Sequence, residues 1–452
     1  RRSRVRPPLP APFKIQMTQI NNLNVKELFK LGFQNQKQKN FQRAIELYDK
    51  VIKIDPTIVF THYNLGIIYE QLGNIEKAEK NYQEAIKVNP SFIYSYNNLG
   101  IMSHQNGQKE NAIKYFKQVI KIDPKYYNGY SNLGLVYASL GMYDQALNNY
   151  LETLALDENN LVAKKSIIFL LTYYEPDNRH YLIKSNNDLR QLQNKFALIE
   201  LLKTDNLNYV LNNSLKIIKK ISININELLF FETQAYRRNP VDLNCKNHHD
   251  IFNSSNIIPK FCFSCFKIQI EPQNVLDLIR LFFIFDNLSL TKNNQRKCMV
   301  EFRNKIPGLY KGMIYCSSLE EAKKILGIIK PNLEILSNVK TSIKRGCSEF
   351  YDKFPKFKII DENEIDFMNY KEDWKKIEEN SVVKRNYNTI KLNNSISGLS
   401  ISDFLIINQW LNYAKNIDDL SYKKLNMDIL NSKFINEKMM NQIEYRRKQL
   451  VK

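Results

Sequence analysis

The chain of 452 residues has little glycine, little cysteine and no long apolar run. Its 13 glycines nowhere form the Gly-rich loop that follows a strand in nucleotide-binding domains, and this excludes the doubly wound enzyme classes. There is also no P-loop, no G-x-S-x-G and no metalloprotease helix motif. Six cysteines are too few for a disulfide scaffold in a chain of this length, so we expect thiols or metal ligands in a reducing compartment.

The longest apolar runs, Ile167–Thr172 and Leu281–Phe285, are far too short to span a bilayer. No apolar signal region lies near the N-terminus, so we expect no export. The length predicts two or three domains with sizeable cores. These absences favour a cytoplasmic protein without membrane contact.

The net charge of +20 is unevenly distributed. Residues 1–24 carry five positive charges and no negative one, and residues 25–158 are nearly neutral, so most of the excess lies in the C-terminal two thirds. Such a basic region is typical of nucleic-acid binding, although the Lys-, Asn- and Ile-rich composition of an AT-rich genome would also produce it. Residues 1–24 read as a disordered, basic, Pro-rich leader; Met17 is a plausible start, and a short transit peptide is the alternative.

A repeat of about 34 residues fills positions 25–160. Each copy places Leu-Gly, then Ala twelve residues later, then an aromatic ring four residues further on. The glycines are Gly32, Gly66, Gly100 and Gly134, and the alanines are Ala44, Ala78, Ala112 and Ala146. The rings are Tyr48, Tyr82, Phe116 and Tyr150, and Pro56, Pro90 and Pro124 close three of the copies.

This pattern resembles the tetratricopeptide repeat (TPR) family. The resemblance implies an α-solenoid of about four helix pairs over residues 25–160, in which each copy buries its apolar face against the next. The small residues would allow close approach of the helices, and proline would end each second helix. It points to a scaffold or adaptor that binds an extended segment of another protein.

In the TPR family the first helix of each copy lines the concave surface. The corresponding positions here hold a row of asparagines, Asn64, Asn98 and Asn132, whose amides can pair with a peptide backbone. Side chains between them would receive the partner's side chains: Phe60, Tyr63, Tyr94, Ile67 and Ile101. The alternative is that asparagine is simply abundant in this chain and common at that family position.

The resemblance also allows two other functions to be tested against the sequence. The family's clamp for a C-terminal carboxylate requires Lys and Asn on the first helix and Lys and Arg on the fifth. This chain has Phe29, Phe33, Tyr94 and Asn98 at those positions and only Asn64 fits, so we reject the clamp. Some TPR arrays precede a glycosyltransferase, but the C-terminal region lacks the glycine-rich loops of such a domain.

The remainder predicts an α+β domain between helical segments. Residues 161–240 read as a helical cap and spacer, beginning with a helix over Leu161–Tyr174. Residues 241–360 alternate strand and helix patterns in the order β-α-β-β-α-β, which is the ferredoxin-like arrangement. Residues 361–452 read as an irregular segment and a helical tail, whose helix begins at a capping box formed by Ser400 and Asp403.

Such a sheet can bind RNA through exposed rings on its open face. Tyr310 and Tyr315, with Phe263 or Phe266, are the candidate rings. An RNA- or nucleic-acid-associated protein is therefore the main alternative to the scaffold.

The pattern Cys245-x2-His248, followed after thirteen residues by Cys262-x2-Cys265, has the spacing of one structural zinc site. His249 is an alternative ligand to His248. In the predicted fold the last strand ends beside the start of the first, which would bring Cys347 to Cys262 and Cys265 as the fourth ligand if the histidines are not used. The site requires a turn at Phe263-Ser264, so the first strand must start later. The alternative is that these cysteines are small buried thiols and the histidines surface residues.

An enzyme with a cysteine nucleophile is the third possibility. Cys347 beside Lys344 and Arg345, with His248 or His249 brought close by the fold, is the sole candidate. We expect no catalytic activity, and the sequence favours the non-enzymatic scaffold.

Overall fold

The computed structural model describes residues 24–221, 233–237, 245–290, 294–303, 306–381 and 394–450. The chain divides into two compact units between Leu133 and Gly134. No helix within the described ranges is long and apolar enough to cross a membrane. The predicted leader, apart from Asn24, lies outside the described residues.

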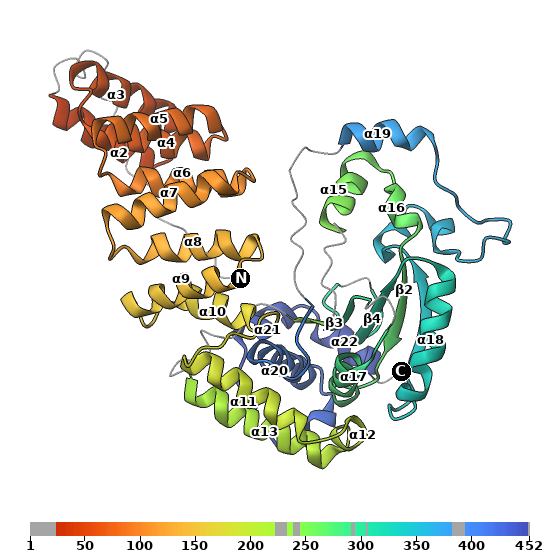
Figure 1. Ribbon diagram of the computed structural model, residues 1–452. Coiled ribbons are helices and arrows are strands. Elements are labelled where there is room, and N and C mark those ends of the chain that lie inside the picture. The colour runs from red at the N-terminus through yellow and green to blue at the C-terminus, as the bar shows by residue number, and fades with distance from the viewer. Residues whose placement is uncertain are drawn as a thin grey trace. The chain divides into compact units, whose positions relative to one another are not determined.

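The first unit is a solenoid of helix pairs (Figure 1). The pairs are α2 (Val25–Lys37) with α3 (Phe41–Ile54), α4 (Val59–Gln71) with α5 (Ile75–Val88), and α6 (Ile93–Gln105) with α7 (Lys109–Ile122). Helix α8 (Tyr127–Ser139) begins the fourth copy and crosses into the second unit, where α9 (Tyr143–Leu156) follows. The predicted repeat is therefore confirmed as helix pairs.

Each repeat glycine makes room for the aromatic ring of its own copy. A Cβ atom on Gly66 would lie 2.5 Å from Cε1 of Tyr82, and one on Gly100 would lie 2.6 Å from Cε1 of Phe116. The two positions are therefore coupled, since a side chain at the glycine would displace a fully buried ring. Pro56, Pro90 and Pro124 each follow two residues after the end of a second helix.

The second unit is built on a five-stranded antiparallel sheet in the order β1-β3-β4-β2-β5. The strands are β1 (Gln234–Arg237), β2 (Phe266–Glu271), β3 (Arg296–Val300), β4 (Tyr310–Cys316) and β5 (Lys340–Arg345). Helix α17 (Val275–Asn287) joins β2 to β3, and α18 (Leu319–Leu333) joins β4 to β5. This is the predicted order of elements. Strand β1 is an addition, in a segment that the sequence pattern predicted to be helical.

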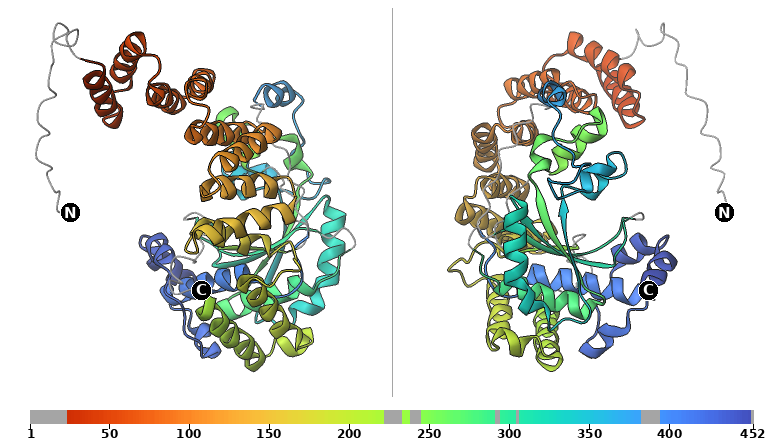
Figure 2. Two further views of the ribbon diagram at one scale, coloured as in Figure 1. Left: turned by 60° about the vertical axis from the view of Figure 1, so that its left-hand side comes forward. Right: turned by 90° about the vertical axis from the view of Figure 1, so that its right-hand side faces the viewer.

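The two faces of the sheet differ sharply in character. Ile268 and Ile314 lie opposite each other on one face, where α17 and α18 pack (Figure 1, Figure 2). Opposite pairs in an antiparallel ladder share a face. We call the opposite face the polar face; it carries Gln234, Tyr236, Lys267, Gln269, Lys297, Lys311, Tyr315 and Lys344.

The remaining helices pack around this sheet. Between the repeats and β1 lie α10 (Leu161–Leu170), α11 (Tyr181–Asn194), α12 (Leu198–Leu201) and α13 (Thr204–Ile221); α15 (Cys245–Ser255) and α16 (Lys260–Phe263) precede β2. After β5 come η1 (Ser348–Phe350), η2 (Pro355–Lys358), α19 (Asp373–Ser381), α20 (Ile401–Asn416), η3 (Leu420–Leu425), α21 (Lys433–Met439) and α22 (Ile443–Leu450). Helix α10 ends four residues before the predicted Tyr174, and the turn that follows the helix ends at Tyr173.

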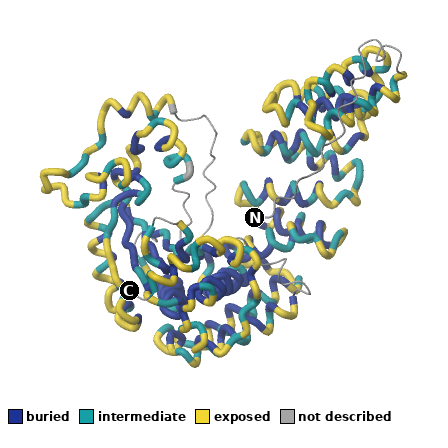
Figure 3. The backbone as a smooth tube through the Cα atoms, turned by 180° about the vertical axis from the view of Figure 1, so that it is seen from behind, coloured by how far each residue is buried: buried dark blue, intermediate teal, exposed yellow. Residues whose placement is uncertain are grey.

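Helix α20 is a central element of the second unit. The Ser400–Asp403 capping box is present at its start. The helix is buried almost throughout and contacts α11, α13, α17 and β1. In Figure 3 the inner elements of this unit are dark blue along their length, whereas the repeat helices alternate between buried and exposed. Segments that the sequence divided into spacer, sheet domain and tail thus belong to one compact unit.

Candidate functional site

Four of the six cysteines gather at the end of the sheet where β2 begins and β5 ends. Cys245 is the first residue of α15, Cys262 lies in α16, Cys265 directly precedes β2, and Cys347 directly follows Gly346 at the end of β5. Cys347 hydrogen-bonds Cys245, and its charge acts on both Cys262 and Cys265. Three separate segments therefore meet at one cluster of thiols.

Backbone geometry holds two of these segments together. Helix α16 ends at Phe263 and β2 begins at Phe266, so the turn required at Phe263-Ser264 is present. The Gly346 N–H donates to the Cys265 carbonyl oxygen at 2.7 Å. Gly346 has a φ of 56°, and a Cβ there would lie 2.5 Å from the ring of Phe357, so this approach requires glycine.

The histidines at the cluster separate clearly. His249 hydrogen-bonds Cys347, and its ring nitrogen, the Cys347 Sγ and a Glu349 oxygen all lie within 4.8 Å of one another. The ring of His248 instead stacks on Phe261, with 5.2 Å between centroids. The sequence-based ligand set placed His248 at the site; the structure brings His249 and Cys347 there, because one helical step along α15 turns the two histidines to different faces.

The thiols differ in their ionisation. The hydrogen bond from the Cys245 thiol lowers the pKa of Cys347; the His249 hydrogen bond and the charge of Lys267 add to this, against the effect of burial. Burial raises the pKa of Cys262, and it raises that of Cys265 to about 11. Cys347 is therefore the thiol that most readily carries negative charge.

An aromatic core lies beneath the cluster. Phe252 of α15, Phe263 of α16 and Trp374 of α19 pack with Phe350 and Phe357. These rings come from helices of four residues or fewer together with α15 and α19. We call this part of the second unit the cysteine lobe; it comprises residues 245–265 and 347–381.

The polar face of the sheet borders the cysteine lobe. Lys267 and Lys344 are direct partners across β2 and β5, which is unfavourable for like charges. Lys297 donates to Gln234 at 3.2 Å; burial and the neighbouring charges of Lys267 and Arg303 lower its pKa to about 8. The face thus holds more positive charge than its own carboxylates neutralise.

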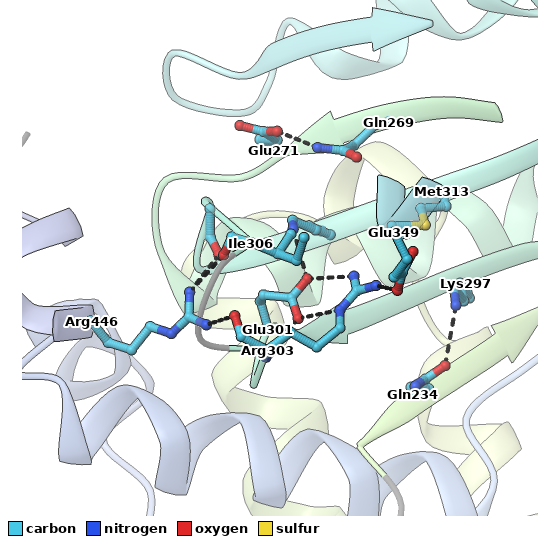
Figure 4. A network of polar contacts seen from close by, with 12 residues as sticks. Gln234, Gln269, Glu271, Lys297, Glu301, Arg303, Ile306, Met313, Glu349 and Arg446 are labelled. Atoms are coloured by element: carbon cyan, nitrogen blue, oxygen red, sulfur yellow. Dashed lines mark hydrogen bonds and ion pairs between the residues drawn. The ribbon is translucent and has the colours of Figure 1, made fainter. Parts of the chain in front are cut away.

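One part of that face is a complete ion-pair network (Figure 4). Glu301 accepts from Lys311 Nζ at 2.7 Å and from Arg303 Nη2 at 2.7 Å, and Arg303 also pairs with Glu349. Arg446 of α22 donates to the Arg303 carbonyl oxygen at 2.6 Å. Through Arg303, the network thus holds Glu349 in position beside His249 and Cys347 of the cysteine cluster.

We expect the stability of the second unit to depend on Glu301 at low pH. Burial would raise the pKa of this carboxyl, but hydrogen bonds from Arg303 and Lys311 outweigh it and lower the pKa to about 2. An unfolded glutamate titrates near about 4.3, so its ionised form stabilises the native state by roughly 3 kcal/mol at neutral pH. That contribution is fully present above the unfolded pKa and is lost as pH falls through the folded pKa.

Urea unfolding at pH values between about 2 and 5 measures this loss. The Glu301→Gln variant should be less stable at neutral pH and should show a flatter dependence on pH over that range. An unchanged slope in the variant would show that other carboxyls produce the acid sensitivity.

On the repeats, the predicted asparagine row is held by the solenoid itself. The Nδ2 atoms of Asn64 and Asn98 donate to the hydroxyls of Tyr48 and Tyr82 at 3.1 Å, and Asn132 donates to Asn97 at 2.9 Å. Asn64 is 7% exposed. Each amide therefore uses at least one N–H inside the solenoid, and this contact orients the side chain. Binding of a peptide backbone by this asparagine row stays a prediction.

Rings from successive copies form a continuous row. The centroids of Phe60 and Phe92 are 5.2 Å apart, those of Phe92 and Tyr94 5.4 Å, and those of Tyr94 and Tyr126 6.2 Å. Tyr63 contacts Phe92 and Tyr94 as well. Phe60 is 50% exposed and Tyr94 46%. Ile67 and Ile101 are half-buried on the same helices. Phe92 and Tyr126 were missed by sequence reasoning because they precede the helices instead of lying within them.

Three of the four rings proposed for RNA stacking are buried. Tyr310 lies on the helix-covered face and donates to Asp419 at 2.6 Å. Phe266 shares that face, and Phe263 is part of the aromatic core of the cysteine lobe. Of the four, Tyr315 alone lies on the polar face, where Tyr236 also lies. The four predicted rings therefore do not form one exposed stacking platform among the described residues.

Comparisons with known proteins find relatives of the repeats. Models described as tetratricopeptide repeat match residues 59–92, 127–160 and 81–114, and a TPR repeat model matches 37–73 and 102–141. No curated protein matches the chain.

Two solved structures illustrate the similarity. A crystal structure of MamA is 28% identical, with a TM-score of 0.30, and covers 32% of this chain and 79% of its own. YrrB, described as a TPR protein with an unusual peptide-binding site, is 17% identical, with a TM-score of 0.29, and covers 32% and 75%. From the family models, the helix pairs and the glycine–ring contacts, residues 37–160 are a segment of the tetratricopeptide repeat family.

Proposed function

We propose that the protein is a scaffold whose repeats hold an extended, uncharged segment of a partner protein. The surface is made by α4, α6 and the beginning of α8. The observation that carries the proposal is the absence of charge there. Glu70 is the one Asp, Glu, Lys or Arg in α4 and α6 together, and residues 127–133 of α8 hold none. Helices α5 and α7, by contrast, are rich in lysine and glutamate.

The chemistry of this surface suits a neutral peptide. Charged side chains of a partner would lose water without gaining an opposite charge, which costs binding energy. The exposed rings of Phe60 and Tyr94 offer apolar contact area at low entropic cost, because each has only two side-chain torsions. The amide oxygens of Asn64, Asn98 and Asn132 supply acceptors for backbone N–H groups. This supports recognition of backbone and apolar side chains without ion pairs.

The test is selection from a random peptide library followed by fluorescence anisotropy with the selected peptides. We expect peptides depleted in Asp, Glu, Lys and Arg, with affinity nearly independent of salt up to about 0.5 M. Tyr94→Ala should weaken binding about 10-fold, which is about 1.4 kcal/mol. Lys114→Ala, an exposed change on α7, is the matched control and should leave the affinity unchanged.

Selection of acidic peptides with salt-sensitive binding would contradict the proposal, as would equal losses in both variants. Salt-sensitive binding of random single-stranded RNA to the full chain would instead support the nucleic-acid alternative. For the sheet itself, we infer a ferredoxin-like arrangement over β2 to β5, with β1 added at the edge. The antiparallel order β3-β4-β2-β5 supports it.

A further inference from the structure

We propose that Cys245, Cys262, Cys265 and Cys347 bind one zinc ion that ties the cysteine lobe to the sheet. This set differs from the sequence-based one, since Cys347 takes the place of His248. It goes beyond the proposed scaffold function and is independent of it, because all four residues belong to the second unit.

The donor set has the chemistry of a closed structural zinc site. Four thiolates in tetrahedral arrangement are a standard zinc environment, and soft sulfur ligands select zinc over magnesium or calcium. Cys262 and Cys265 lie on one tight turn, as a close pair of ligands requires, and Gly346 places Cys347 beside that turn. Cys245 supplies a ligand from the start of α15 and already hydrogen-bonds Cys347.

The charges around the cluster match a metal–thiolate centre. Zinc with four thiolates carries a net charge of about −2. Lys267 is only 6% exposed and makes no ion pair with any residue that the structure describes. A buried lysine without a direct ion-pair partner is costly. Lys267 acts on the Glu349 carboxylate and on the thiols of Cys262, Cys265 and Cys347. The negative centre would add a second counter-charge.

His249 and Glu349 then take a supporting position. His249 donates to the Cys347 sulfur, and its ring nitrogen lies close to the Glu349 carboxylate that Arg303 fixes. Outer hydrogen bonds of this kind orient metal ligands and commonly change metal affinity by about 10–100-fold.

The small core of the cysteine lobe also favours stabilisation by a bound metal. Three rings of this core, Phe263, Phe350 and Phe357, lie in α16, η1 and η2, each of four residues or fewer, and small cores of this kind are commonly completed by a metal or disulfides. A competing reading uses the same group differently, with Cys347 as a nucleophile, His249 as its base and Glu349 as orienter. That reading leaves the convergence of the other three thiols without a role.

The first measurement is elemental analysis of the purified full chain by inductively coupled plasma mass spectrometry. We expect about one zinc per chain in the wild type. Cys262→Ser and Cys347→Ser should each lose the metal, whereas His248→Ala, the matched control, should retain it. Cobalt(II) substituted for zinc should show the sulfur-to-metal charge-transfer absorption of thiolate ligation, and Cys347→Ser should lose it.

Two further measurements on folded protein protect the test against variants that fail to fold. In the wild type, four thiols should be shielded from a thiol reagent and become reactive when a chelator removes the zinc. Lys267→Met should still bind zinc but release it to the chelator about 10-fold faster. Absence of metal in the wild type, with Cys347 alone alkylated rapidly at neutral pH, would overturn the proposal in favour of the nucleophile. Zinc retained by Cys347→Ser but lost by His248→Ala would overturn the ligand set.

Discussion

Replacing Arg237 with alanine is expected to lower the free energy of unfolding of the second unit by about 3–5 kcal/mol. Arg237 is 1% exposed, and it pairs with Asp286 at 3.0 Å and with Asp403 at 2.6 Å. Both aspartates are buried as well. Alanine would leave two carboxylates without a cation in the interior, and this penalty far exceeds the loss of an exposed pair.

The position of Arg237 makes the effect global within this unit. Asp286 belongs to α17 and also accepts from Gln193 of α11 at 3.1 Å, while Asp403 is the N3 residue of the capping box of α20. The guanidinium lies 4.3 Å from the ring centroid of Phe282. One side chain on β1 therefore joins the sheet to three helices that are distant in sequence.

Urea unfolding followed by tryptophan fluorescence isolates this unit, because both tryptophans, Trp374 and Trp410, lie in it. Arg447→Ala is the matched control: its pair with Asp418 is exposed, and we expect a change of at most about 1 kcal/mol. Equal midpoints for Arg237→Ala and Arg447→Ala would show that the buried pairs contribute no more than surface ones.

The second large effect is expected in the repeats, where Tyr82→Ala should destabilise the first unit by about 3–5 kcal/mol. The ring of Tyr82 is fully buried against Gly66, so its removal leaves a cavity. Its hydroxyl donates to Glu70 at 2.8 Å and accepts from Asn98 at 3.1 Å, joining two successive copies. Since each copy is stabilised by its neighbours, damage at this joint weakens the array on both sides.

Tyr82→Phe separates the two contributions, because it keeps the ring and removes only the hydroxyl. We expect it to cost about 1 kcal/mol. Hydrogen exchange read by mass spectrometry would report the loss in α4 to α7, and Tyr127→Ala, at an exposed ring, should leave those helices protected. If Tyr82→Phe were as damaging as Tyr82→Ala, the hydroxyl network and not the packing would hold the copies together.

The repeats and the sheet could be predicted from local patterns. The Leu-Gly, Ala and ring positions act within one copy, so period alone reveals the pairs. Strands such as β4 show alternation along a few residues, and the predicted bounds Tyr310–Cys316 are those observed. These features depend on neighbours in sequence, which a single chain displays directly.

Local patterns say less about residues whose partners are distant. Helix α20 is apolar around most of its surface, which indicates burial, but no local pattern says against what. Strand β1 is four residues long and too short to show alternation. His248 was preferred to Cys347 because its close spacing from Cys245 is visible in the sequence, whereas Cys347 reaches the cluster only through the predicted pairing of the last strand with the first.

The wide separation of β1 and α20 along the chain has a consequence for synthesis. The repeats make contacts between successive helices, so they can fold as they leave the ribosome. The second unit is different. Arg237 of β1 pairs with both Asp286 and Asp403, and the pair with Asp403 can form only after α20 has been synthesised. A nascent chain therefore carries a finished solenoid followed by strands whose apolar face is not yet covered by α20. During that interval the protein depends on its own slow long-range closure, or on a chaperone, to avoid aggregation.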